Sequence, residues 1–236
     1  MRARILWTLP RAPDLHPQEN GAASSRGWFR LVEFSFRFRW LVALEWVFML
    51  KGRLVGLRGR RRDDVEALFE LTADAEHVAL THTWPFRPVS LAARHSEFDK
   101  RQSEPDPNSA FFTIQRLDDN AGAAVGSVGL QMIDMHNRNA HVGISLLPSV
   151  RGQGLGRDAI EVVCRFGFEI RALERLSLET LEINAPMRAT ATSCGFVEEG
   201  RLRSAIWYFG RYVDDVLYGL LVDQWRARTG PREPVG

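Results

Sequence analysis

The sequence predicts an α/β (α+β) fold in which helices flank a mixed central sheet. Apolar residues make up 45% and charged residues 25% of the 236 residues, which is typical of a globular protein with a sizeable core. Segments with a strand-like period of two are interspersed with segments whose apolar residues recur every three to four positions. Three consecutive strand patterns, separated by short turns, precede a strand-turn-helix unit and indicate an antiparallel meander.

The first 50 residues differ from the rest of the chain. Residues 11–27 are rich in Pro, Ala, Ser and Gly and are typical of a linker. Residues 28–50 are apolar and aromatic, with a strand-like alternation in part of the segment. Three interpretations stay open: an element packed on the domain, an amphipathic surface for a membrane or partner, or sequence upstream of a true start at Met49.

We therefore divide the chain into three parts. These are an atypical N-terminal extension (1–50), one α/β domain (51–225) and a polar tail (226–236) that we expect to be frayed.

The first half of the domain begins with a short strand, Arg53–Arg58, and a helix, Arg62–Ala73. Asp63 and Asp64 suit the positive N-terminus of that helix. A second helix is expected over Ser90–Gln102. The three strands of the meander follow, at Ala110–Leu117, Ala124–Ile133 and Ala140–Leu147.

The second half begins with a long helix, Gly154–Arg171, whose apolar residues share one face. A strand over Arg175–Leu181 leads to a short helix, Asn184–Cys194, with a proline in its first turn and Gly195 as its C-terminal cap. Two final strands are expected at Phe196–Tyr208 and Val213–Val222.

Charge and cysteine content exclude several classes of protein. A formal net charge of +2 does not require a nucleic-acid partner, and we interpret the arginine-rich segment Arg58–Arg62 as a solvated loop. Cys164 and Cys194 lack the spacing of a metal site or disulfide framework, so we expect two reduced thiols, no metal and a cytoplasmic location. No segment has the roughly 18 apolar residues of a transmembrane helix.

The most informative segment joins the last meander strand to the long helix. Between Leu146 and Arg157 it places glycines at 152, 154 and 156, with arginines at 151 and 157. Glycines allow close backbone approach, and the N–H groups at a helix N-terminus form an anion site. The segment therefore predicts a pyrophosphate-binding turn, although it has neither a P-loop Gly-Lys-Ser/Thr nor the GxGxxG spacing of a dinucleotide site.

This segment resembles the cofactor motif of the GNAT (Gcn5-related) N-acetyltransferase superfamily, Gln/Arg-x-x-Gly-x-Gly/Ala, which Arg151, Gly154 and Gly156 match. Asn184, followed about a dozen residues later by Gly195-Phe196, matches a second family element. Residues 198–203 and 210–214 resemble the RimJ/RimL-like, ribosomal-protein N-acetyltransferase branch. The resemblance covers roughly Leu54 to Leu221.

The resemblance implies that acetyl-CoA is the cosubstrate and that the sheet splays at the cofactor site. It implies direct transfer to an amine in a ternary complex, with backbone groups near Leu146 and Leu147 pairing with pantetheine. Asn184 would bond the pantetheine arm or order the site. The diphosphate would be held by Arg151, Gly152, Gln153, Gly154, Leu155, Gly156 and Arg157.

His141 stands where many relatives carry a glutamate, two residues before a glycine. We interpret it as a general base, because the ordinary pKa of histidine suits proton transfer near neutral pH. The alternative is an ordinary strand residue, with water deprotonating the amine. Glu182 and Asp134 are weaker candidates.

The general acid is less well defined, because the family's tyrosine position is Ala191 here. Tyr208, Tyr212 or Ser193 could replace it, Tyr208 being the one we place in the site, or no protein acid is needed. Trp207 and Tyr208 line an acceptor groove or, as is commoner for aromatic residues in strands, pack in the core.

Two functions follow. The first is an N-acetyltransferase that acts on a primary amine, either a protein N-terminus or a small molecule. The alternative is a catalytically weak domain that binds acyl-CoA as a sensor or interaction module. The sequence leaves open the identity of the acceptor and the oligomeric state, a homodimer included.

Overall fold

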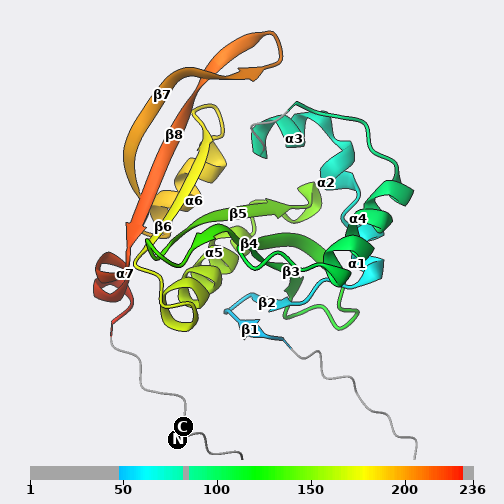
Figure 1. Cartoon of the computed structure of the whole chain (residues 1–236), viewed down its shortest axis with the longest axis horizontal. Coiled ribbons are helices and arrows are strands. Elements are labelled where there is room, and N and C mark those ends of the chain that lie inside the picture. Colours follow the sequence, from blue (N-terminus) through cyan, green and yellow to red (C-terminus); the bar gives the residue numbers. More distant parts are fainter. Residues whose placement is uncertain (1–47, 82–84, 231–236) are drawn as a thin grey trace, which may run out of the picture. The chain divides into compact units, whose positions relative to one another are not determined.

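The computed structural model describes residues 48–81 and 85–230 (Figure 1), so the extension whose three interpretations stay open lies almost entirely outside the described residues. In the first half of the domain the elements are β1 (Leu50–Lys51), β2 (Val55–Arg58), α1 (Arg62–Ala67), α2 (Glu70–Ala73), α3 (Ala75–Thr81), α4 (Leu91–Ser103), β3 (Ala110–Arg116), β4 (Ala124–Asp134) and β5 (Asn139–Leu146). In the second half they are α5 (Leu155–Arg165), β6 (Arg175–Leu181), α6 (Ala185–Ser193), β7 (Val197–Tyr208), β8 (Arg211–Leu221) and α7 (Val222–Thr229).

The strands form one eight-stranded sheet in the order β1-β2-β3-β4-β5-β6-β8-β7. All neighbouring strands are antiparallel except β5 and β6, which run parallel. The predicted mixed sheet and the predicted antiparallel meander β3-β4-β5 are thus confirmed.

The parallel pair is short. β5 pairs with β6 only from Asn139 to His141, opposite Arg175 to Ser177. β5 then continues to Leu146 and β6 to Leu181, each still paired with its other neighbour. The sheet therefore opens between the C-terminal ends of these two strands, as Figure 1 shows.

The main core lies on one face of the sheet, under α5, α6 and α7. Helix α5 contributes a stripe of buried residues, and the ring of Phe168 packs against Trp225 of α7 at 5.3 Å. Helix α1 lies on the opposite face, where its Asp64 accepts a hydrogen bond from Thr113 of β3. Phe112, the neighbour of Thr113, is part of the core on the α5 side, because adjacent strand residues face opposite sides.

A buried carboxylate holds α5 in place. Asp158, in its first turn, accepts hydrogen bonds from the backbone N–H groups of Arg53, Leu54 and Val55 at 3.0, 2.8 and 3.0 Å. These donors lead into β2, so one side chain ties the start of the domain to the start of the helix.

A second buried network corrects our interpretation of the arginine-rich segment. Arg58 is only 3% exposed and forms a bidentate ion pair with Asp64, with N–O distances of 2.7 and 2.8 Å. Burial alone would raise the pKa of Asp64, but hydrogen bonds from Arg58 and the Arg61 N–H outweigh it and lower that pKa. Arg58 is thus part of the structure's interior and not of a solvated loop.

Helix boundaries differ from the prediction in two places. The expected helix Arg62–Ala73 breaks at Leu68, whose backbone adopts φ −97° and ψ 5°, and α3 was not predicted. Leu68 and Leu71 form a small buried cluster with Ala124, so tertiary packing decides the geometry here. Farther along, the helix expected to reach Arg171 ends its α-helical part at Arg165 and continues as a π-helical turn, Phe166–Ile170.

The residues Arg226 to Thr229, which we expected to be frayed, are helical in α7. The reason is Trp225, only 6% exposed, whose burial fixes a helix that is otherwise polar. Among the described residues, no helix is long and apolar enough to cross a membrane.

Candidate active site

The opening between β5 and β6 exposes backbone polar groups of β5. The N–H of Leu147 donates to the carbonyl of Val125 on the β4 side at 3.0 Å. Because N–H and C=O groups alternate between the two edges of a strand, Ile144 and Leu146 direct theirs into the opening. An extended chain could therefore add to this edge as a strand does. The N–H of Leu147 already has its partner in β4, so the expected pairing falls to Leu146 and Ile144.

The predicted pyrophosphate turn connects β5 to α5. Gly152 and Gly154 adopt φ values of +75° and +80°, which L side chains rarely adopt. Gly154 is the N-cap of α5, and no side chain caps the N–H groups of the first turn, which contains Leu155, Gly156 and Arg157. Such N–H groups, with the helix dipole, can bind an anion, so this turn fits a diphosphate.

The third glycine serves packing. A Cβ atom on Gly156 would lie 3.2 Å from Cδ1 of Leu146, which is tighter than most such contacts. Gly156 thus lets the helix approach the strand edge that borders the opening.

The polar side chains of the turn are already engaged. The Nε of Arg151 donates to the carbonyl of Leu146 at 3.0 Å, and one of its terminal nitrogens lies 2.9 Å from Nδ1 of His77. Gln153 accepts a hydrogen bond from Arg116. Arg157 forms a 3.0 Å ion pair with Glu161. The backbone of the turn, rather than its arginines, is therefore the part most directly available to a phosphate. A shallow cavity of about 280 Å³ lies beside it, lined in part by Arg53, Arg116 and Gln153.

Asn184 is the N-cap of α6, and its side chain accepts a hydrogen bond from the N–H of Met187 at 3.3 Å. It follows β6 directly and so lies beyond the C-terminal end of one strand that borders the opening. Ala191, at the position of the family's tyrosine, is fully buried in the core. A tyrosine could not be placed there without rearranging that core.

His141 is the last β5 residue that pairs with β6, so it lies where the opening begins. Its neighbours Ala140 and Val142 belong to the core, and His141 therefore faces the other side of the sheet. Burial lowers the pKa of His141, and the negative charge of Asp215 opposes that effect. A neutral imidazole at this place can accept a proton near neutral pH.

Two carboxylates share this face with His141. On β6, Leu176 and Leu178 are core residues, which places Glu179 opposite. On β8, Val216 is a core residue, which does the same for Asp215. Burial raises the pKa of both groups, and the charge of Glu179 raises that of Asp215 further.

Tyr208 lies at the tip of the β7–β8 hairpin, opposite Arg211, and its ring packs against Phe209 at 5.1 Å. Asp215 lies four positions after Arg211 on β8, which corresponds to roughly 13 Å of strand. Its role as a general acid stays a prediction. Trp207, also near the tip, is 60% exposed, so the interpretation of it as a core residue was wrong.

The weaker base candidates have other partners. Glu182 lies 3.3 Å from Arg201, and Asp134 accepts hydrogen bonds from the N–H groups of His136 and Asn137 in the turn before β5. These contacts fit structural roles.

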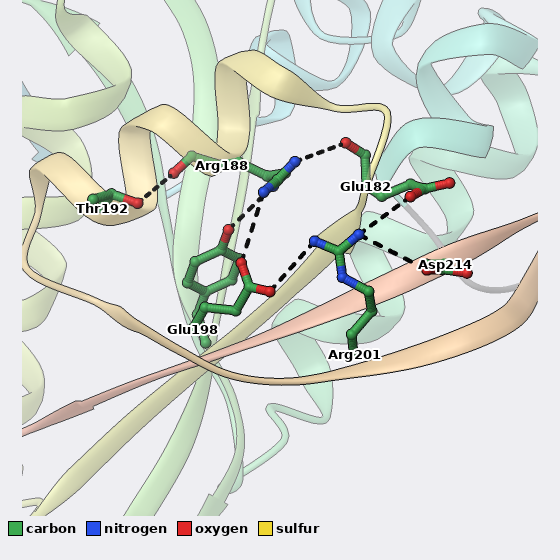
Figure 2. Close-up of polar contacts among 7 residues, drawn as sticks. Glu182, Arg188, Thr192, Glu198, Arg201 and Asp214 are labelled. Carbon is green, nitrogen blue, oxygen red and sulfur yellow. Dashed lines mark hydrogen bonds and ion pairs between the residues drawn. The ribbon is translucent and has the colours of Figure 1, made fainter.

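Glu182 belongs to a set of ion pairs beyond the end of β6, shown in Figure 2. Arg201 contacts Glu198 and Asp214 at 3.4 and 3.8 Å, besides Glu182. Arg188 of α6 lies 3.7 Å from Glu198 and donates to the Tyr218 hydroxyl at 3.3 Å. We call the residues Glu182, Arg188, Glu198, Arg201 and Asp214 the ion-pair cluster; it fastens α6 to β7 and β8.

Three polar residues of this region were missed by sequence reasoning. His77 of α3 contacts Arg151, and Glu179 and Asp215 lie on the same face as His141. Alternation within β6 and β8 was the sequence signal for the orientation of Glu179 and Asp215, and His77 had no such signal. Among the described residues, no group of three His, Cys, Asp or Glu could hold a metal ion. Both cysteines, Cys164 and Cys194, are buried free thiols, as predicted.

Known proteins resemble this chain both in sequence and in fold. Residues 54–197 match the family model described as acetyltransferase (GNAT) domain. The chain is 27% identical over 165 residues to the uncharacterized N-acetyltransferase p20 of Bacillus licheniformis, covering 70% of this chain and 91% of the relative. It is 30% identical over 106 residues to the putative ribosomal N-acetyltransferase YdaF of Bacillus subtilis, covering 45% of this chain and 58% of that one.

Among solved structures, the fold is similar to that of a spermidine N-acetyltransferase from Vibrio cholerae, crystallised with CoA and spermine. The TM-score is 0.65 at 23% identity, covering 72% of this chain and 97% of the other.

Proposed function

Since this chain belongs to the GNAT acetyltransferase family, we propose that it transfers the acetyl group of acetyl-CoA directly to a primary amine in a ternary complex. That it is an acyltransferase of the N-acetyltransferase kind follows from the family and its relatives. The direct-transfer mechanism, the residues that carry it and the acceptor are our proposal. The observation that carries them is the turn of uncapped N–H groups at α5, next to a strand edge left open by β6.

In the proposed complex the diphosphate of acetyl-CoA binds the backbone of residues 151–157. Pantetheine lies along the edge of β5 at Ile144 and Leu146, and Asn184 orders the far side. A backbone N–H of that edge would polarise the thioester carbonyl.

The reaction then needs one bond formed and one broken. The amine nitrogen attacks the thioester carbon, the C–N bond forms, the C–S bond breaks and the CoA thiolate leaves. The ammonium form of the acceptor must first lose one proton to give the neutral amine, and His141 would accept that proton directly or through water. A second proton leaves the nitrogen as the amide forms, and protonation of the departing thiolate balances it. The thiolate is finally protonated by solvent or by a group such as Tyr208.

The acceptor is a primary amine of a protein N-terminus or of a small molecule. The relative named as a putative ribosomal N-acetyltransferase supports assignment to the RimJ/RimL-like branch, and a spermidine N(1)-acetyltransferase of Vibrio cholerae is 32% identical over 90 residues. We expect the enzyme in the cytoplasm, where its free cysteines would stay reduced. A homodimer stays a prediction for sedimentation velocity to test.

The test begins with binding. Calorimetry should detect CoA and acetyl-CoA binding to the wild-type protein, and Gly152→Val should weaken it at least about tenfold, because the new side chain would enter the turn. Gly230→Val is the matched control: Gly152 and Gly230 have φ values of +75° and +70°, and a Cβ on either meets nothing within 4 Å. Equal loss in both variants would contradict the assigned site.

Turnover is measured next, as thiol release from acetyl-CoA with a panel of small amines and peptides. Acetylation of at least one amine supports the proposal. Tight acetyl-CoA binding without turnover on any amine would instead support the sensor alternative.

A further inference from the structure

The side of the sheet that carries His141 has an unusual charge balance. Many described carboxylates form no ion pair, but few of these are buried, so the partners of the buried ones are informative. On the other side of the sheet, Asp214, Glu182 and Glu198 all lie within 4 Å of an arginine (Figure 2). Within the described chain, neither Glu179 nor Asp215 forms an ion pair of that kind.

Asp215 is the more unusual of the two. The residue is only 4% exposed. Within the described chain its carboxylate accepts no hydrogen bond from a side chain, and its one favourable backbone contact is the neighbouring Val216 N–H. A deeply placed carboxylate without a cation is costly, and a cationic ligand would offset that cost.

The register of the sheet brings these groups together. His141 pairs with Ser177 on β6, and Glu179 lies two residues farther along the same face. Glu179 is opposite Leu217 of β8, and Asp215 is the next residue on that face of β8. Asp215 interacts electrostatically with both Glu179 and His141. The three side chains thus share one face of the sheet. His141 is level with Ser177, where the opening begins, the exposed Glu179 lies two residues farther along β6, and Asp215 is level with Leu181, where β6 ends.

We propose that Glu179 and Asp215 form a cation subsite that selects a primary amine carrying a second positive charge. This inference rests on the proposed function, because it takes His141 to mark the place of the reacting amine. The distal ammonium would replace the missing arginine by forming charge-assisted hydrogen bonds to the two carboxylates. The reacting amine would then lie near His141.

The test compares two acceptors of equal length, 1,4-diaminobutane and butylamine, which differ in the distal charge. With saturating acetyl-CoA, wild-type kcat/KM should favour the diamine at least about tenfold, after correction for its two equivalent amines. Glu179→Gln and Asp215→Asn should each lower the ratio of diamine to butylamine kcat/KM at least about fivefold. A preference unchanged in both variants, or an equal loss on both acceptors, would overturn the subsite.

Peptides that carry Lys or norleucine at their second position distinguish the source of the second charge. A preference for the Lys peptide would indicate that the acceptor is a protein N-terminus with a cationic second residue. A preference for the diamine without a preference for the Lys peptide would indicate that the acceptor is a small diamine. Asp223→Asn is the matched control, since the Asp223 side chain is 90% exposed on α7. It should leave every ratio unchanged, and thermal melts should show that all variants are folded.

A binding measurement separates this inference from the proposed function. Calorimetry of 1,4-diaminobutane on CoA-saturated protein needs no turnover. Suppose that wild type binds the diamine, that Asp215→Asn binds it at least about fivefold more weakly, and that no amine is acetylated. The proposed acetyl transfer would then be wrong, and the subsite would be supported. If amines are acetylated but the variants bind the diamine as wild type does, the subsite fails and the function stands.

Discussion

Asp214 and Asp215 are neighbours on β8, yet the two sides of the sheet treat their carboxylates differently. Asp214 accepts a hydrogen bond from the Ser204 N–H at 2.9 Å and lies in the ion-pair cluster. Asp215 is more deeply buried, forms no ion pair with a described residue, and has the neighbouring Val216 N–H as its one favourable backbone contact. Because strand residues alternate in direction, a shift of one position separates a carboxylate that holds the fold from one that is left for a ligand.

The carboxylates of Asp64, Asp214 and Asp215 therefore differ in their cations. Asp64, buried on the α1 side, has Arg58; Asp214 has Arg201; Asp215 has none that the structure describes.

Asp64→Asn should have the largest effect on stability. It would leave the buried Arg58 without its charge partner, which typically costs about 3–5 kcal/mol. Because the pKa of Asp64 is lowered in the folded state, its contribution is complete above the ordinary value of 3.8 and is lost as pH falls through the lowered pKa. Urea unfolding at pH 7 and at acid pH measures both. A loss below about 1 kcal/mol at pH 7 would remove the distinction between paired and unpaired carboxylates.

His141→Gln should reduce kcat about 100-fold at pH 7 if the imidazole is the general base. The pKa of His141 is lowered from 6.5, so the wild-type rate should fall only at pH values below that number, as the imidazole becomes protonated. The variant should lose this acid limb in a pH profile of kcat/KM. A variant with an unchanged profile would indicate that water deprotonates the amine. His141 would then no longer mark the place of the reacting amine beside Glu179 and Asp215.

Arg201→Met should cost about 1 kcal/mol of stability, because its contacts are half exposed and individually weak. The cost should shrink in 1 M salt, which screens such pairs. Arg226→Met is the control, since its only described ion pair joins two exposed side chains on α7. Equal costs for the two variants would show that the ion-pair cluster adds nothing beyond a single surface pair.

Asp215→Asn should have the smallest effect on stability, with an unfolding free energy equal to wild type or up to about 1 kcal/mol higher at pH 7. The pKa of Asp215 is raised in the folded state, so its ionisation favours unfolding. The difference should therefore disappear as pH falls below the ordinary value of 3.8. A variant that is clearly less stable at pH 7 would mean that the carboxylate has a structural partner after all.

The part of the site that we propose for acetyl-CoA could be predicted from sequence because it is continuous. Gly152, Gly154 and Gly156 lie within five residues, and their spacing predicts a strand-to-helix turn with exposed N–H groups. Short-range alternation likewise predicted every strand of the sheet except the two-residue β1.

The rest of the proposed acceptor side, beyond His141, could not be predicted, because it is assembled from three strands. Asp215 reaches the site only because β8 inserts between β6 and β7, an order that no local pattern encodes. Tertiary packing also decided the break at Leu68 and the helix around Trp225, where local sequence favoured a longer helix and a frayed tail.

Three residue pairs join β5 to β6, and this small number makes the protein two half-sheets with a narrow seam. The pantetheine arm of the cosubstrate, bound along Ile144 and Leu146, would make the backbone hydrogen bonds that β6 does not make there and would join the two half-sheets. Amide exchange at those two residues should slow most when the cosubstrate is present, so an unfolding transition measured without it reports on a molecule that is still incomplete.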